Sequence, residues 1–235
     1  MLITGGTSGI GLSLGEAFLG EGAAVAVCGR SPEALERFSR RHPDALAVQA
    51  DVTVPAARAV LLDSIEHRFG RVDVLVNNAG TFVERDFATG APATLALDEE
   101  VALNLTAPIH LTGEVLQRWQ PLQAVVFVTS GFALVSPTRA PTYGAVKAGL
   151  HGFADGLRRQ LEPQGTHVLE VLPPRTDTPM NSGSTATKLT PAEVATATVK
   201  ALRQRRPMAL PGQTRLLPTM LRIAPRTLGR AVAAL

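Results

Sequence analysis

The sequence of 235 residues predicts an α/β fold: a single domain, residues 1–235, built on a doubly wound parallel sheet of about seven strands with helices on both faces. Two observations lead to this prediction. Short apolar runs rich in valine and leucine alternate with longer amphipathic segments, and such runs are typical of strands buried on both faces of a sheet. A regular alternation of strand and helix then gives right-handed crossovers and a parallel sheet.

The same patterns give the bounds of the individual strands and helices. The start of the last helix is marked most clearly, because Thr190, Pro191 and Glu193 form a capping-box pattern there. The first strand is short for a central strand, which suggests that residues are missing from its start. The predicted strands are 2–4, 24–28, 45–49, 72–77, 124–129 and 167–172. The predicted helices are 9–21, 32–41, 54–69, 98–119, 143–161 and 190–204.

Composition excludes several classes of protein. No run of 18 apolar residues is present, so no membrane-spanning helix is expected. A net charge of +3 with 4% aromatic residues does not favour nucleic-acid binding. The single cysteine, Cys28, excludes an internal disulfide and is interpreted as an inert core thiol. The sequence has no signal segment at its start, so we expect a cytoplasmic protein. His110 and His151 lack paired ligand spacing and are interpreted as packing or surface residues, so no metal site is predicted.

A glycine-rich segment, "TGGTSGIG" (4–11), joins the first strand to the first helix. Glycines at 5, 9 and 11 permit a tight turn and a close approach of backbone N–H groups to a phosphate, which the helix N-terminus also favours. This setting predicts a Rossmann-type dinucleotide site. The alternative is a glycine-rich turn without a ligand.

The residue after the second strand bears on the choice of dinucleotide. NAD sites usually place an acidic residue there, whereas this sequence has Gly29 followed by Arg30. An arginine can pair with a 2′-phosphate, so NADP(H) is favoured and NAD(H) is the alternative. The less favoured alternative is that Arg30 is a solvated loop residue.

Tyr143, the only tyrosine, lies four residues before Lys147, so both side chains share one helix face. Ser130 ends the preceding strand, where doubly wound sheets bind ligands. A free phenol has a pKa of about 10, and a nearby ammonium lowers it. The three side chains therefore suit hydride transfer to a carbonyl, with the phenol supplying the proton.

Six motifs in the same order resemble the short-chain dehydrogenase/reductase family, in its compact single-domain branch. They extend over residues 2 to about 180, and "LITGGTSGIGL" with "LPPRTDT" resembles the subgroup named for the oxidoreductase encoded with teichoic-acid D-alanylation enzymes. The motifs are "TGGTSGIG" (4–11), "DV" (51–52), "NNAG" (77–80), Asn104 in "VALNLTAP", Ser130 and "YGAVK" (143–147).

The resemblance implies a role for each catalytic residue. Tyr143 is the acid in reduction and the base in oxidation. Lys147 lowers the pKa of Tyr143 and holds the nicotinamide ribose, and Ser130 orients the carbonyl. Asn104 holds a water that links Lys147 to solvent, although an asparagine that only hydrogen-bonds the backbone is the alternative.

The resemblance also implies a dinucleotide-binding set. Pro174 stands where the family usually has glycine, which leaves the contact of Thr176 and Thr178 with the carboxamide in doubt. The set is Gly5, Thr7, Ser8, Gly9, Ile10, Gly11, Arg30, Asp51, Val52, Asn77, Ala79, Gly80, Tyr143, Lys147, Pro173, Thr176 and Thr178.

The substrate pocket is expected from residues 82–96 and from a substrate loop near 175–190. Phe82 and Phe132 would be apolar walls of this pocket or ordinary packing residues. The basic, amphipathic segment 214–235 is expected to cover the sheet edge or a subunit interface, and a helix lying on a membrane surface is the less favoured alternative. The resemblance further implies a homodimer or homotetramer formed through helices 98–119 and 143–161.

These observations favour an NADPH-preferring carbonyl reductase or alcohol dehydrogenase acting on a small-molecule ketone, aldehyde or alcohol. An enoyl C=C reductase on the same fold is one alternative. A non-catalytic dinucleotide-binding or redox-sensing protein is the other, because a fold does not determine a function.

Overall fold

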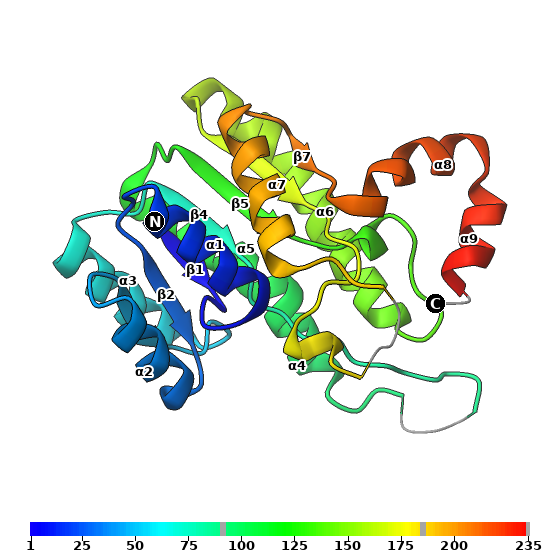
Figure 1. Ribbon diagram of the computed structural model, residues 1–235, viewed down its shortest axis with the longest axis horizontal. Helices are drawn as coiled ribbons and strands as arrows, with labels where there is room; N and C mark the ends of the chain where they lie inside the picture. The colour runs from blue at the N-terminus through cyan, green and yellow to red at the C-terminus, as the bar shows by residue number, and fades with distance from the viewer. Residues whose placement is uncertain (90–92, 184–186, 234–235) are drawn as a thin grey trace.

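Seven parallel strands form one sheet in the computed structural model, which describes residues 1–89, 93–183 and 187–233 (Figure 1). Their spatial order is β3-β2-β1-β4-β5-β6-β7, so the chain reverses direction across the sheet between β1 and β4. This order confirms the doubly wound fold. The strands are β1 (Leu2–Thr4), β2 (Ala26–Gly29), β3 (Leu46–Gln49), β4 (Val74–Asn77), β5 (Ala124–Val128), β6 (His167–Val171) and β7 (Met208–Ala209).

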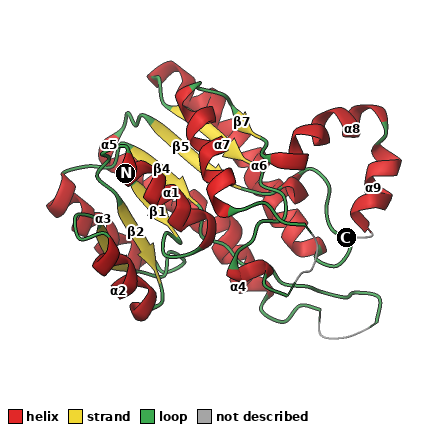
Figure 2. Cartoon of the chain, viewed as in Figure 1, coloured by secondary structure: helices red, strands yellow, loops and turns green. Residues whose placement is uncertain are grey.

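Helices cover both faces of this sheet (Figure 2). Alternate residues of the strands point to opposite faces, so Leu2 and Phe127 belong to one apolar core and Ile3 and Val126 to the other. The first core is closed by α3 (Pro55–Phe69), α5 (Ala107–Trp119) and α6 (Pro141–Leu161). The second core is closed by α1 (Gly9–Gly20), α2 (Pro32–Arg41) and α7 (Pro191–Arg203).

The predicted helix 98–119 is interrupted. It consists of α4 (Leu97–Val101), a π-helical turn at Ala102–Thr106 and then α5. Pro108 has no N–H and so cannot donate to the carbonyl of Asn104, four residues earlier, which accounts for the break in the α-helical pattern. The interruption centres on a predicted catalytic residue.

The C-terminal segment forms two short helices, α8 (Leu217–Ile223) and α9 (Pro225–Ala233), and the second helix begins at a proline. Figure 1 shows them to one side of the sheet, beyond the end of β7. The expectation for this segment was that it covers the sheet edge or a subunit interface; α8 and α9 stand to one side of the edge strand (Figure 1), and the subunit interface stays a prediction. Among the helices in the described ranges, none is long and apolar enough to cross a membrane.

The start of α7 agrees with the sequence in detail. The hydroxyl of Thr190 accepts from the backbone N–H of Glu193, and the Glu193 carboxylate accepts from the N–H of Thr190. This is the predicted capping box. Parts of the expected pocket and tail segments, residues 90–92, 184–186 and 234–235, lie outside the described residues.

Candidate active site

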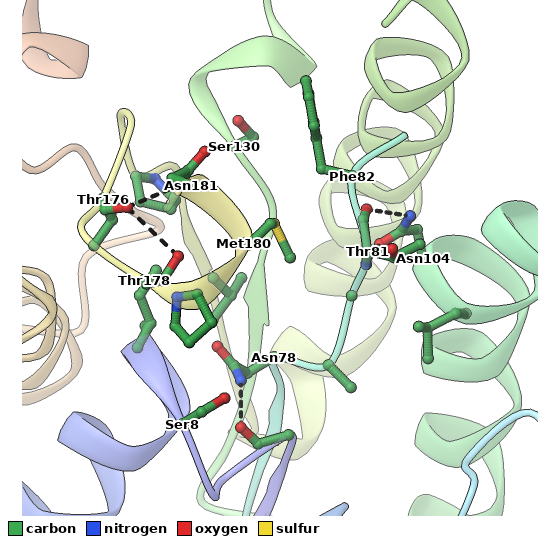
Figure 3. Close-up of a pocket in the computed structure, with 18 of the residues that line it drawn as sticks. Ser8, Asn78, Thr81, Phe82, Asn104, Ser130, Thr176, Thr178, Met180 and Asn181 are labelled. Carbon is green, nitrogen blue, oxygen red and sulfur yellow. Dashed lines mark hydrogen bonds between the residues drawn. The ribbon is translucent and has the colours of Figure 1, made fainter. Parts of the chain in front are cut away.

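A cleft of about 600 Å³ opens at the carboxyl ends of the central strands, where the strand order reverses. Figure 3 shows side chains from the glycine-rich turn, the loops after β4 and β5 and the loop after β6 facing this space. Most of the predicted site residues line it, as expected from the meeting of strand ends at one edge. They are Gly5, Thr7, Ser8, Ile10, Arg30, Asp51, Val52, Ala79, Gly80, Asn104, Ser130, Tyr143, Lys147, Pro173, Thr176 and Thr178.

Three of the residues predicted to bind the dinucleotide, Gly9, Gly11 and Asn77, do not line the cleft but shape the segments that do. Gly9 has φ of +52°, and Gly11 packs so closely that an added Cβ would lie 2.4 Å from the carbonyl oxygen of Gly5. Both positions therefore require glycine to hold the turn. The Asn77 amide is buried and donates to the hydroxyl of Thr112 at 3.0 Å, so it ties β4 to α5.

Asn78, which is not among the residues predicted to bind the dinucleotide, organises the same turn. Its Nδ2 donates to the carbonyl oxygens of Thr4 at 2.9 Å and Gly5 at 3.2 Å. The hydroxyl of Thr4 accepts in turn from the backbone N–H groups of Asn78 and Ala79. The signal was present, because Asn78 is the second asparagine of "NNAG".

The glycine-rich turn has the two features that a dinucleotide phosphate requires, namely space for close approach and a helix N-terminus. Its glycines leave room for close approach, and the helix N-terminus of α1 beside Ser8 faces the cleft. Arg30 is exposed at the rim of the cleft. Asp51 also lines the cleft; partial burial opposes its ionisation, but hydrogen bonds from Thr53 and the charge of Arg30 hold the pKa of its carboxyl below the usual value.

Tyr143 lies in the first turn of α6 and is buried against the loop that follows β5. Burial raises the pKa of Tyr143 to about 12, a hydrogen bond with the Ser130 side chain lowers it, and the charge of Glu100 raises it. From the nearby lysine, the pKa of Tyr143 was expected to lie below its ordinary value. The structure corrects this expectation, because loss of solvent around the phenolate dominates in the protein alone.

Lys147 lies one helical turn after Tyr143, with its Nζ 5.7 Å from the centre of the tyrosine ring. The ammonium is buried and donates to the carbonyl oxygen of Val128 at 3.1 Å. Burial lowers the pKa of Lys147 to about 8, and the carboxylate of Glu170 opposes this decrease. The predicted pairing of phenol and ammonium on one helix face is therefore present.

A buried carboxylate lies beneath this lysine. Glu170, on β6, accepts from the hydroxyl of Thr129 at 2.6 Å, and its second oxygen is 2.7 Å from Nδ1 of His151. His151 is one turn after Lys147 on α6, so Tyr143, Lys147 and His151 share a face. His151, interpreted from the sequence as a packing or surface residue, is partly exposed and in addition pairs with this buried carboxylate. Among the described residues, no cluster of His, Cys, Asp and Glu could hold a metal.

Asn104 contacts the loop after β4 directly. Its Oδ1 accepts from the backbone N–H of Thr81 at 3.1 Å, and its Nδ2 donates to the Thr81 carbonyl at 2.9 Å (Figure 3). A Cβ added at Gly80 would lie 2.6 Å from Asn104 Oδ1 and 3.5 Å from Lys147 Nζ. Gly80 thus lets these two side chains approach the cleft together, and the water between them stays a prediction.

Aromatic rings enclose the phenol. The rings of Phe82 and Phe132 meet the Tyr143 ring edge to face, with centroids 4.9 and 6.4 Å away. Both phenylalanines also line the cleft, so they are pocket walls as well as packing partners. On the opposite side, the hydroxyl of Thr176 donates to the Pro174 carbonyl at 2.9 Å.

A buried ion pair fixes the segment after Phe82. The Arg85 guanidinium contacts the Glu100 carboxylate at 3.0 Å, and both side chains are almost wholly buried. Arg85 also donates to the backbone carbonyls of Ala93, Leu95 and Ala96, while Glu100 accepts from the hydroxyl of Thr142 at 2.7 Å. This network joins the pocket wall to the residue before Tyr143.

The comparisons agree with this geometry. The family model for short chain dehydrogenases matches residues 1–189. The chain belongs to the short-chain dehydrogenase family. It is accordingly an NAD(P)-dependent oxidoreductase. The uncharacterized oxidoreductase DltE of Bacillus subtilis is 38% identical over 186 residues, which cover 78% of this chain and 74% of that protein.

Two solved structures of this family extend the similarity over nearly the whole chain. A short-chain dehydrogenase from Streptomyces avermitilis is 28% identical with a TM-score of 0.85, covering 98% of this chain and 94% of its own. One from Sphingobium yanoikuyae, in complex with NADPH, is 27% identical with a TM-score of 0.82, covering 97% and 93%. The predicted family and the DltE-like subgroup are therefore confirmed.

Proposed function

We propose that this oxidoreductase is an NADPH-preferring carbonyl reductase, which acts as an alcohol dehydrogenase in the reverse direction. The observation that carries the proposal is that Ser130, the buried phenol of Tyr143 and the ammonium of Lys147 line one cleft, with Lys147 Nζ 5.7 Å from the centre of the tyrosine ring. A non-catalytic binder would have no need of a titratable phenol in such a setting. The same pairing favours a carbonyl oxygen over an enoyl C=C bond as the proton acceptor.

The chain's own groups would divide the work as follows. Ser130 would donate a hydrogen bond to the substrate oxygen and hold it beside Tyr143. The phenol, whose pKa of about 12 keeps it protonated near neutral pH, would give its proton to that oxygen as negative charge develops. The Lys147 ammonium would stabilise the phenolate that remains. A bound nicotinamide cofactor would supply the hydride that forms the new C–H bond.

Arg30 supports the preference for NADPH, because it lies at the rim of the cleft where an acid for NAD would stand. The Sphingobium relative was solved with NADPH, which agrees with this proposal. A putative ketoacyl reductase of Streptomyces coelicolor, 34% identical over 76% of this chain and 71% of its own, supports carbonyl chemistry. We further propose a homodimer or homotetramer formed through α5 and α6, which light scattering would test.

The proposal is tested by titrating NADPH and NADH and then assaying a panel of ketones and aldehydes by the loss of cofactor absorbance. Arg30→Glu should weaken NADPH binding about 10- to 100-fold, the effect of losing a charge-assisted hydrogen bond, and should change NADH binding much less. Arg37→Glu, on the exposed side of α2, is the control for charge. Equal binding of both dinucleotides by the unmodified protein would refute the preference, and tight binding without turnover on any carbonyl would favour a sensor.

A further inference from the structure

A second cavity, of about 530 Å³, lies between the catalytic loop and the C-terminal helices α8 and α9. Its walls are mostly apolar. Among the described residues that line it, Arg175 is the only charged one. The aliphatic walls come from Val135, Leu216, Leu217, Met220, Leu228 and Val232.

This cavity adjoins the active-site cleft. Ser130, Phe132, Pro173, Pro174 and Arg175 line both spaces. Ser130 is the residue assigned to the substrate oxygen, so a molecule held there has the cleft on one side and the apolar cavity on the other. Neither of the pocket segments expected from the sequence alone includes α8 or α9.

The C-terminal segment is packed closely against the catalytic loop. A Cβ added at Gly131 would lie 2.9 Å from the Thr214 side chain and 3.1 Å from the Leu217 side chain. The Gly131 N–H also donates to the carbonyl of Pro173 at 3.0 Å. Glycine directly after Ser130 thus lets the wall of the cavity reach the reactive residues.

The two helices turn their apolar sides to this cavity. Leu228 and Val232 are each only 8% exposed, although Figure 1 shows α9 away from the main sheet. Arg222, Arg226 and Arg230 are exposed. The amphipathic pattern of the segment is therefore explained by a cavity beside the active site.

We infer that the α8–α9 cavity binds an unbranched or weakly branched apolar chain carried by the carbonyl substrate. Such an occupant matches the aliphatic walls, and its attachment to the reacting carbonyl matches the shared lining at Ser130. The inference rests on the proposed function, because it assigns that reaction to ketones or aldehydes with an extended hydrocarbon part.

The test measures binding separately from turnover. Calorimetry with a series of straight-chain secondary alcohols, from butan-2-ol to decan-2-ol, gives affinities in the absence of cofactor. Each methylene that enters the cavity should strengthen binding about fourfold, until the chain fills the space. The matching 2-ketones, assayed with NADPH, should show the same dependence in kcat/KM.

Met220→Glu should remove the chain-length dependence, because it places a carboxylate in the apolar wall. The matched control is Ile223→Glu on the same helix, where the side chain is 72% exposed; it should leave the dependence intact. Ala231→Phe is a second variant that narrows the cavity without a buried charge, and it should end the increase in affinity at a shorter chain.

The outcomes separate the two proposals. Affinity that rises with chain length, without reduction of any ketone, would support the cavity and contradict the proposed reaction. Ketone reduction with affinities independent of chain length would overturn the inference and leave the reaction standing. Affinity independent of chain length, together with a change of oligomeric state in Met220→Glu, would show that the cavity is covered by a second copy of the chain.

Discussion

Glu170→Gln should move the alkaline limit of activity to lower pH. Lys147 must be charged to stabilise the phenolate, and burial already lowers its pKa from 10.5 to about 8. The carboxylate of Glu170 opposes this effect of burial. Glutamine has nearly the same shape and can still accept from Thr129, so the substitution removes mainly the negative charge.

The size of the effect follows from the two pKa values. An opposite charge at close range raises the pKa of an ammonium by about one unit or more, so the variant's pKa should be about 7. At about pH 8 the charged fraction of Lys147 then falls from about one half to about one tenth, and kcat/KM should fall about fivefold. At about pH 6 both proteins keep the ammonium, and their kcat/KM should agree within about twofold.

The assay is the pH profile of kcat/KM, which reports the pKa values of the free enzyme. Glu162→Gln is the matched control, because Glu162 is an exposed carboxylate near the end of α6 and its loss changes the net charge equally. The reasoning is refuted if the alkaline limb of Glu170→Gln coincides with that of the unmodified protein, or if the control moves it equally.

Three further predictions concern the buried ion pair, the glycine turn and the core thiol. Glu100→Gln should lower the free energy of unfolding by about 3–5 kcal/mol in urea, because it leaves the buried guanidinium of Arg85 without its counter-charge; a loss below about 1 kcal/mol would contradict this. Gly11→Ala should abolish NADPH binding in a direct titration, because the new Cβ would lie 2.4 Å from a backbone oxygen of the turn. Gly20→Ala, on the same helix with nothing within 4 Å, should bind normally, and equal binding by both variants would argue against the steric account. Cys28 should resist a thiol reagent at about pH 8 until denaturant is added, because burial raises the pKa of its thiol to about 12; rapid labelling of the native protein would contradict the buried placement.

The order of elements and the catalytic set could be predicted because they depend on local patterns. Buried parallel strands are continuous apolar runs, and a spacing of four places Tyr143 and Lys147 on one helix face. The two-residue strand β7 gives no such run. Pro108 was a signal for the π-helical turn, because a proline has no N–H to donate to the carbonyl four residues earlier.

Side-chain contacts between distant segments could not be predicted in this way. Arg85 and Glu100 form an ion pair, although the segment between them has no periodic pattern. Glu170 on β6 pairs with His151 on α6. The charged Glu170 within a buried strand was itself a signal, because such a residue needs a partner. The pKa of Tyr143 depends on burial by Phe82 and Phe132, which only the folded chain shows.

The central claim is that the Tyr143 phenol supplies the proton to a carbonyl oxygen. The most direct measurement compares Tyr143→Phe with the unmodified protein, using one active carbonyl substrate and a separate NADPH titration. The account predicts a fall in kcat of about 100- to 10,000-fold, the usual contribution of a positioned general acid, with NADPH affinity within about threefold. Turnover that survives the substitution would contradict the mechanism, whatever the cofactor affinity.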